Sequence, residues 1–282
     1  MPRRAKALRG VSPTPLHCHT PPVLELDDTQ IPTRVSAGSE TEARRILSQV
    51  SRARDWASPL LGRDVGFALV VADEQDWASV AGVPIHLPHA SPDRIVAPAR
   101  PTTAFGESLR TYWPHIDEER RRALTAAYGE TLDTTPFVEL IVVHELGHVF
   151  HLQVPFRFGR FWLTEFFANL LMVGYVAEVE PQLWPHVEHF ASAAASSPPM
   201  DGWAHALDDM ELSLQVGPEN YIWYQMILVD RAIAVWRSSG AEGMRRLFDE
   251  CRTPDSEDGA LTRTLASIDP QLTQVVRDWP AP

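Results

Sequence analysis

The sequence predicts an α+β fold, with a small N-terminal α/β lobe that holds a short sheet and a larger, mainly helical C-terminal lobe. Three observations support this class. Apolar runs typical of strands occur in the first hundred residues, at 65–72 and 94–97. From Thr135 onward the apolar residues recur at helical spacing. A chain of 282 residues, of which 44% are hydrophobic, is long and apolar enough to bury a substantial core.

Residues 1–33 are expected to form a disordered tail, because they carry six prolines and show no hydrophobic periodicity. A targeting or docking arm is the alternative interpretation, since the first ten residues are basic.

The α/β lobe is expected over residues 34–155. Its predicted elements are a helix from Ser39 to Trp56 capped by Ser39, a strand from Val65 to Ala72, a helix from Asp73 to Ala81 capped by Asp73, a strand from Arg94 to Ala97 and a helix from Glu118 to Ala127. Prolines on both sides of residues 94–97 indicate an edge strand.

Residues 156–282 are expected to form the helical lobe, although the helical pattern begins before the boundary near residue 155. The predicted helices span 136–153, 161–179, 182–195, 219–238, 241–252 and, in two pieces, 259–278.

Charge and cysteine content exclude several classes of partner. With 37 acidic and 25 basic residues the formal net charge is −12, which disfavours non-specific binding of nucleic acid or anionic lipid. Cys18 and Cys251 cannot form a disulfide framework, and two free thiols are favoured over a single bridge. The chain shows no apolar signal-peptide stretch and no run of the roughly 18 apolar residues that a membrane span needs. We therefore expect a soluble, cytoplasmic protein without nucleic-acid or membrane partners.

The pattern with chemical meaning is His144-Glu145-Leu146-Gly147-His148, inside an apolar helical stretch. Histidines at i and i+4 lie on one helix face, so both imidazoles can bind one metal ion. Glu145 is rotated by about 100° from His144. It is therefore poorly placed as a ligand and well placed as a general base beside a metal-activated water. The alternative is a helix with two partly buried histidines and a surface glutamate. A buried helix would leave these polar groups without partners unless a metal supplied one.

A catalytic zinc site needs a third protein ligand, and Glu165 is the best candidate. It is the only charged residue between Phe161 and Ala177, and the break at Pro155 and Gly159 allows a second helix to return and place it opposite His148.

Neighbouring residues complete this interpretation. Asn169, four residues after Glu165, can hydrogen-bond a ligand histidine from behind. A third histidine six residues after His148 is excluded because Val154 stands there, and His151 is interpreted as a polar residue near a helix end. The alternative for Glu165 is a place on an exposed stripe of its helix.

His144, Glu145, His148 and Glu165 together resemble the gluzincin zinc metallopeptidases, the thermolysin and aminopeptidase-like clan. The resemblance is specific over residues 137–170. It implies a zincin-like fold, a Zn²⁺ ion held by the two histidines and Glu165, and hydrolysis of peptide or protein substrates with Glu145 as general base. The 17-residue spacing from His148 to Glu165 is slightly shorter than in the best-known members, and Asn169 replaces a more familiar aspartate.

The resemblance also assigns roles outside the motif. An edge strand before the motif helix binds peptide by strand addition in this clan, and the candidate is Arg94, Ile95, Val96 and Ala97. The segment from Asn220 to Gln225 resembles the downstream tyrosine segment that stabilises the oxyanion. Tyr221 is chosen there, with Tyr224 as the second choice and His205 as a weaker one. No segment resembles the Gly-x-Met-Glu-Asn anchor of a substrate amino terminus, so aminopeptidase activity is not expected.

Two other classes of function compete with an enzyme. One is a non-catalytic zinc scaffold or peptide-binding module on the same fold, and the other is an interaction protein that uses these residues only for packing. The intact Glu145 favours the enzyme, because a structural zinc site does not need it.

Overall fold

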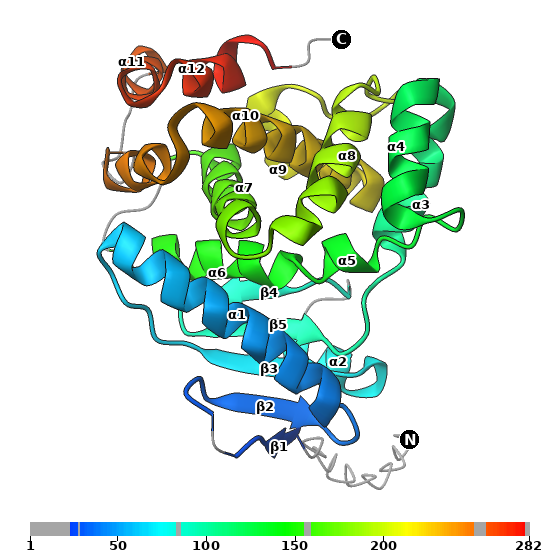
Figure 1. The fold of residues 1–282 in the computed structure, drawn as a ribbon, viewed down its shortest axis with the longest axis vertical. Coiled ribbons are helices and arrows are strands. Elements are labelled where there is room, and N and C mark those ends of the chain that lie inside the picture. The colour runs from blue at the N-terminus through cyan, green and yellow to red at the C-terminus, as the bar shows by residue number, and fades with distance from the viewer. Residues whose placement is uncertain (1–22, 28, 83–85, 155–158, 251–257, 280–282) are drawn as a thin grey trace, which may run out of the picture.

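The computed structural model describes residues 23–27, 29–82, 86–154, 159–250 and 258–279, and has the predicted α+β composition (Figure 1). A five-stranded mixed sheet lies at the lower end of the molecule in Figure 1, and the helices from α3 onward lie mainly above it. The strands are β1 (Val23–Glu25), β2 (Thr33–Ser36), β3 (Ala68–Ala72), β4 (His89–Ser91) and β5 (Arg94–Pro98). Their order is β1-β2-β3-β5-β4, with β2, β3 and β5 parallel and the two outer strands antiparallel.

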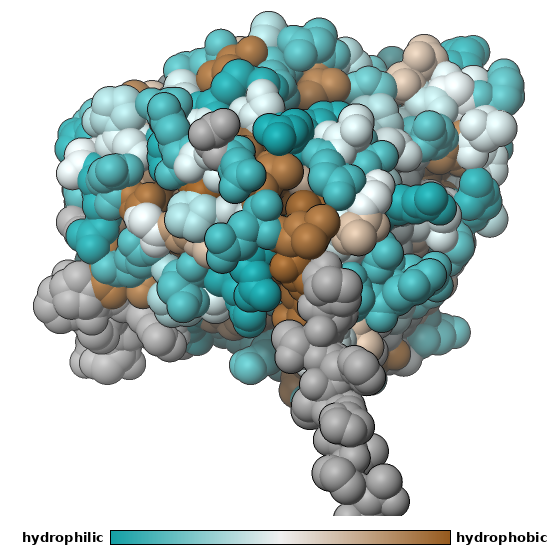
Figure 2. Space-filling model, turned by 90° about the horizontal axis from the view of Figure 1, so that it is seen from below, coloured by the Kyte–Doolittle hydropathy of each residue, from teal (hydrophilic) through white to brown (hydrophobic). Residues whose placement is uncertain are grey.

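The two faces of the sheet are covered unequally. On β3, Leu69 and Val71 face the main core, which contains α1 (Glu40–Leu61) and α6 (Ile141–Leu152). Val70 and Ala72 face the smaller cluster around Trp77 of α2 (Glu74–Ala81). This alternation follows from the two-residue period of a strand with both faces buried. Seen from below, the surface is mainly hydrophilic, with a narrow apolar strip at its centre (Figure 2).

The prediction that residues 94–97 form an edge strand is wrong. β5 pairs with β3 along its whole length and with β4 on its other side, so β4 is the edge. The flanking prolines are compatible with an inner position because Pro92 precedes the strand and Pro98 is its last residue. Arg94, Ile95, Val96 and Ala97 therefore have no free edge to offer to a peptide.

The predicted tail is too long. Residues 1–22 lie outside the described residues, whereas β1 and β2 pair as an antiparallel hairpin, in which Leu26 N donates to the Thr33 carbonyl at 2.8 Å. Leu26, Ile31 and Val35 are buried in the core and hold this hairpin. Pro32 fits because its carbonyl accepts a hydrogen bond from Leu69 N, and this contact needs no donor from the proline.

The remaining helices mostly match the predicted ones. α7 follows the predicted boundaries, and the predicted helix over 136–153 is divided into α5 and α6. The predicted helices over 219–238 and 241–252 are the two halves of α10, which meet at Gly240, where φ is 54°. α3 and α9 were not predicted. The full set is α3 (Ala104–Tyr112), α4 (Glu118–Tyr128), α5 (Thr135–Val138), α7 (Phe161–Glu178), α8 (Trp184–Ala195), α9 (Met210–Val216), α10 (Pro218–Glu250), α11 (Asp258–Ile268) and α12 (Pro270–Arg277), with 3-10 turns at Trp113–His115, Pro181–Leu183 and Leu207–Asp209.

α7 is the central helix of the helical part of the fold. It packs against α6 on one side and α10 on another, and 14 of its residues are buried. Neither α7 nor any other helix in the described ranges has the length and apolar character needed to cross a membrane. The apolar surface of α7 is instead covered by its neighbouring helices.

Replacing Asp73 with alanine (Asp73→Ala) is expected to lower the free energy of unfolding by about 1 kcal/mol. The carboxylate accepts hydrogen bonds from the first backbone N–H groups of α2, those of Gln75 at 3.0 Å and Asp76 at 2.9 Å. Denaturant titration measures the change. Ser39→Ala is the matched control, because Ser39 holds the same position before α1 but makes no side-chain cap. An equal loss in both variants would contradict the capping argument.

Candidate metal centre

The predicted ligands come from α6 and α7, which pack closely enough to bring their side chains together. Gly147 lies against Ala168, and a Cβ placed on Gly147 would be 2.7 Å from the Ala168 Cα. This close approach places Glu165 of α7 beside His144 and His148 of α6. The side chains of His144, His148 and Glu165 are 9%, 14% and 6% exposed, so the cluster is largely removed from water.

Three ligand atoms converge on one point. The Nε2 atoms of His144 and His148 are 3.0 Å apart, and the Glu165 Oε2 atom lies 3.2 Å from the first and 3.4 Å from the second. Glu145 also borders the group, with a carboxylate oxygen within 4.8 Å of both histidines. Glu165 is the candidate third ligand because its Oε2 atom lies within 3.4 Å of both Nε2 atoms. The cluster can hold a metal ion while Glu145 stays beside it.

Both histidines are held from behind through Nδ1. The Nδ1 atom of His144 lies 2.9 Å from the Asn169 Oδ1 atom, which is the contact predicted for Asn169. The Nδ1 atom of His148 lies 2.8 Å from the Nε2 atom of His151. The sequence interpretation missed this contact, although the spacing from His148 to His151 puts both on one helix face. Such contacts fix the ring orientation and leave each Nε2 directed at the cluster.

Tyr221 and Gln225 of α10 complete the cluster on its far side. The Gln225 Nε2 atom lies 2.6 Å from Glu165 Oε2 and 2.7 Å from the Tyr221 hydroxyl, which itself donates to Glu165 Oε2 at 3.3 Å. Tyr221 was the first-choice tyrosine, and it is the one that reaches the cluster. Gln225 was missed, and its only signal is that it stands four residues after Tyr221 on the same helix face.

The other two candidates for the oxyanion role make contacts elsewhere. The Tyr224 hydroxyl donates to the Ala206 carbonyl at 2.7 Å. The His205 Nδ1 atom lies 3.3 Å from the Trp203 carbonyl, and the His205 carbonyl accepts from the Trp279 indole at 2.7 Å.

Burial and mutual charge shift the acidity of these groups. Burial acts to raise the pKa of Glu165, but His148 and His144 outweigh it and hold that pKa well below its ordinary value. Burial acts to lower the pKa of His148, but the Glu165 carboxylate raises it to about 9. Burial raises the pKa of Glu145 to about 7, against the opposing effect of the two histidines. Glu165 is thus an anion at neutral pH, whereas the carboxyl group of Glu145 gains or loses its proton close to neutral pH.

A cavity of about 470 Å³ opens beside the cluster. One part of its wall is polar and contains His144, Glu145, Asn169, Tyr221 and Gln225. The rest is apolar and contains Leu87, Pro88, Phe105, Phe137, Ile141, Met172 and Met226. The edge strand β4 lies close by, because a backbone hydrogen bond from Ala90 helps to lower the pKa of Glu145. A molecule in the cavity would therefore meet the carboxylate of Glu145 on one side and an apolar wall on the other.

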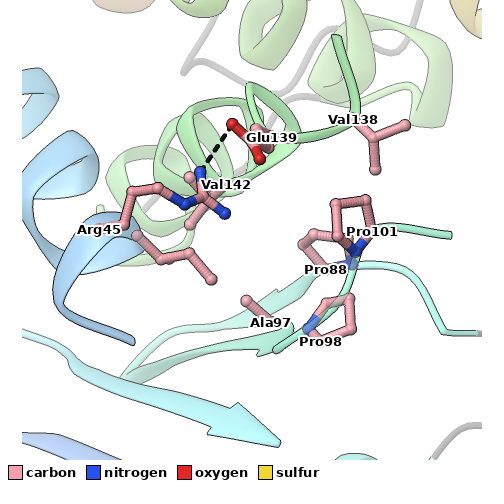
Figure 3. A pocket seen from close by; sticks show the side chains of 9 residues that line it. Arg45, Pro88, Ala97, Pro98, Pro101, Val138, Glu139 and Val142 are labelled. Atoms are coloured by element: carbon pink, nitrogen blue, oxygen red, sulfur yellow. Dashed lines mark ion pairs between the residues drawn. The ribbon is translucent and has the colours of Figure 1, made fainter. Parts of the chain in front are cut away.

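A second, smaller pocket of about 310 Å³ shares Pro88 with this cavity (Figure 3). Figure 3 shows Arg45 and Glu139 joined in an ion pair on one side of it, with their charged atoms 2.6 Å apart. The other labelled side chains there are apolar, among them Pro98 and Pro101. Its two charges are already paired, so the cluster of His144, His148 and Glu165 remains the better candidate for a functional site.

Comparison with known proteins gives no family model, no curated protein and no solved structure that matches this chain. The functional argument therefore rests on the geometry of the cluster itself.

Glu165→Ala is expected to abolish stoichiometric metal binding. It removes the anionic member of the ligand triangle, so the affinity should fall by more than the roughly 10–100-fold that loss of an outer hydrogen bond costs. Elemental analysis of the purified protein after dialysis measures the metal content. Glu178→Ala is the matched control on the same helix, since Glu178 bonds the Trp56 indole away from the cluster. Unchanged metal content in Glu165→Ala would remove Glu165 from the site.

Proposed function

We propose that the protein is a zinc-dependent metallopeptidase of zincin-like fold, with Zn²⁺ held by His144, His148 and Glu165. One observation carries the choice of zinc. Ligands at 2.0–2.1 Å in a tetrahedral arrangement lie about 3.3 Å from one another. The three atoms here are 3.0, 3.2 and 3.4 Å apart, and two imidazole nitrogens with one carboxylate form a known catalytic zinc set.

The electrostatics of the cluster support a cation at this place. Two imidazole nitrogens and a carboxylate oxygen direct electron pairs at one small, buried volume. Such a convergence is costly without a positive charge to offset it. In the metal-free cluster His148 supplies this positive charge, because the Glu165 carboxylate raises the pKa of His148 to about 9, and a bound Zn²⁺ would take its place.

In the proposed reaction, Zn²⁺ supplies Lewis acidity, which polarises a carbonyl and lowers the pKa of water. Glu145 accepts the proton of the water that attacks the peptide carbonyl and passes it to the leaving amine. Burial raises the pKa of Glu145 above its ordinary value, which favours proton uptake, and its place beside the ligands keeps it available for both transfers.

Tyr221 is the proposed donor to the oxyanion. Burial, with the nearby charges of Glu165 and Glu145, keeps the pKa of its hydroxyl well above the ordinary value, so the proton is retained. The hydroxyl lines the same cavity as Glu145 and can turn its proton from Glu165 to a substrate oxygen. A donor in this role contributes about 3 kcal/mol to the transition state.

The proposed substrate is an extended peptide that pairs with β4, which replaces the assignment of residues 94–97. β4 is the edge of the sheet and packs against the motif helix α6. Main-chain pairing with an edge strand provides affinity that does not depend on sequence. The apolar wall of the cavity would then receive one substrate side chain. We further propose a cytoplasmic location, because the two cysteines of the chain favour free thiols in a reducing compartment.

Glu145→Gln is expected to retain zinc and to reduce peptide hydrolysis by about 10²–10⁴-fold, since the amide cannot accept the proton. Digestion of a broad peptide library, followed by mass spectrometry, measures the activity. Glu139→Gln is the control, because Glu139 is paired with Arg45 in the second pocket. Equal turnover by Glu145→Gln and the wild type would exclude Glu145 as the base. Zinc without activity in the wild type would favour the non-catalytic scaffold.

Tyr221→Phe is expected to lower kcat by about 10²–10³-fold with little change in KM, because the lost hydrogen bond forms only in the transition state. Steady-state kinetics on the best library peptide measures both constants. Tyr224→Phe should leave them unchanged, since that hydroxyl bonds the Ala206 carbonyl. The opposite ranking of the two variants would transfer the role to Tyr224.

A further inference from the structure

We propose that Gln225 is a positioning residue of the metal site, which acts with Asn169 as one unit to join the ligands His144 and Glu165. The unit, here called the amide pair, fixes the imidazole of His144 with its proton on Nδ1 and holds the carboxylate of Glu165 as an acceptor. The inference rests on the proposed metal site and does not depend on peptide hydrolysis.

The amide pair is a continuous, buried chain of hydrogen bonds. The Nδ1 atom of His144 lies 2.9 Å from Asn169 Oδ1, and Asn169 Nδ2 donates to Gln225 Oε1 at 2.8 Å. Gln225 Nε2 then donates to Glu165 Oε2 at 2.6 Å. Asn169 is 2% exposed and Gln225 is 7% exposed, so water competes little for these groups. This hydrogen-bond chain begins at His144 on α6, passes through Asn169 on α7 and Gln225 on α10, and ends at Glu165 on α7.

The direction of this chain is set by Glu165. A carboxylate only accepts hydrogen bonds, so Gln225 must present its NH₂ group to it. The Gln225 carbonyl is then left for Asn169, which must present its own NH₂ group. The Asn169 carbonyl consequently faces His144, whose Nδ1 must donate. A neutral imidazole with its proton on Nδ1 directs the electron pair of Nε2 at the cluster, as a metal ligand requires.

This arrangement explains why residue 169 is an asparagine and not an acid. An aspartate could accept from His144 but could not donate to the Gln225 carbonyl. The second N–H of Gln225 is also used, since it donates to the Tyr221 hydroxyl at 2.7 Å. The amide atoms of Asn169 and Gln225 that face the cluster thus each have a hydrogen-bond donor or acceptor as required. Loss of either amide breaks the hydrogen-bond chain from His144 to Glu165.

The test is a double-variant cycle on zinc affinity, measured by competition with a chromophoric chelator. Gln225→Met keeps the length of the side chain without its hydrogen bonds, and Asn169→Ala removes the other amide. Each single variant is expected to weaken zinc binding by about 10–100-fold. The double variant should bind zinc no more weakly than the weaker single variant. Losses that multiply would show two independent supports and overturn the proposal.

Gln49→Met is the matched control for a lost buried amide. Gln49 donates at 3.3 Å to the carboxylate of Glu180, which is not a member of the cluster, and Gln49 is 8% exposed. The substitution Gln49→Met should lower the melting temperature of the metal-free protein without changing the zinc affinity. An equal loss of zinc affinity in Gln49→Met and Gln225→Met would show that general destabilisation, not positioning, is the cause.

A spectroscopic measurement tests the tautomer directly, and its deciding arm uses the wild type alone. The ¹⁵N shifts of His144 in the metal-free wild type should show the proton on Nδ1, and Gln225→Met should shift the ring towards a mixture of tautomers. A proton on Nε2 in the wild type would overturn the proposal. Because neither measurement uses hydrolysis, an intact cycle with no peptidase activity would reject the proposed function and leave this inference standing.

Discussion

The close packing of α6 against α7 sets the distance between the histidine pair and Glu165, and the rest of the site depends on that distance. Gly147 permits the approach, because a side chain there would start 2.7 Å from the backbone of Ala168. Real Cβ atoms almost never come so near to another heavy atom, so a larger residue would move α7 outward. The distances among His144 Nε2, His148 Nε2 and Glu165 Oε2 can change by only a few tenths of an ångström before the three atoms no longer suit one small cation.

Much of the site could be predicted from sequence because its key relations are local. The spacing of His144 and His148 fixes their common face wherever the helix lies, and the same rule joins Glu165 to Asn169. We could predict that the helix of the two histidines pairs with the helix of Glu165 for two reasons. The connection between them is short, and Glu165 is the single charge in an apolar helix. The structure brings these four residues together, and a carboxylate oxygen of Glu145 also lies within 4.8 Å of ligand atoms of His144 and His148.

The features that were missed depend on contacts between distant parts of the chain. Gln225 is 60 residues from Glu165, and helical spacing does not state which face of α10 meets α7. The position of β5 inside the sheet depends on β4, a three-residue strand too short to give a periodic signal. The hairpin at residues 23–36 is fixed by a few buried apolar side chains, whereas the proline content of that region suggested disorder. In each case a tertiary contact outweighed a local preference.

The shortness of β4 has a consequence for selectivity under the proposed function. A strand of three residues can pair with only a brief stretch of another chain, so main-chain recognition would supply modest affinity and little length discrimination. Most of the discrimination would then fall to the single side chain that enters the cavity between Phe105 and Met226. The edge therefore suits a short extended segment, and residues beyond that segment would gain no further main-chain pairing.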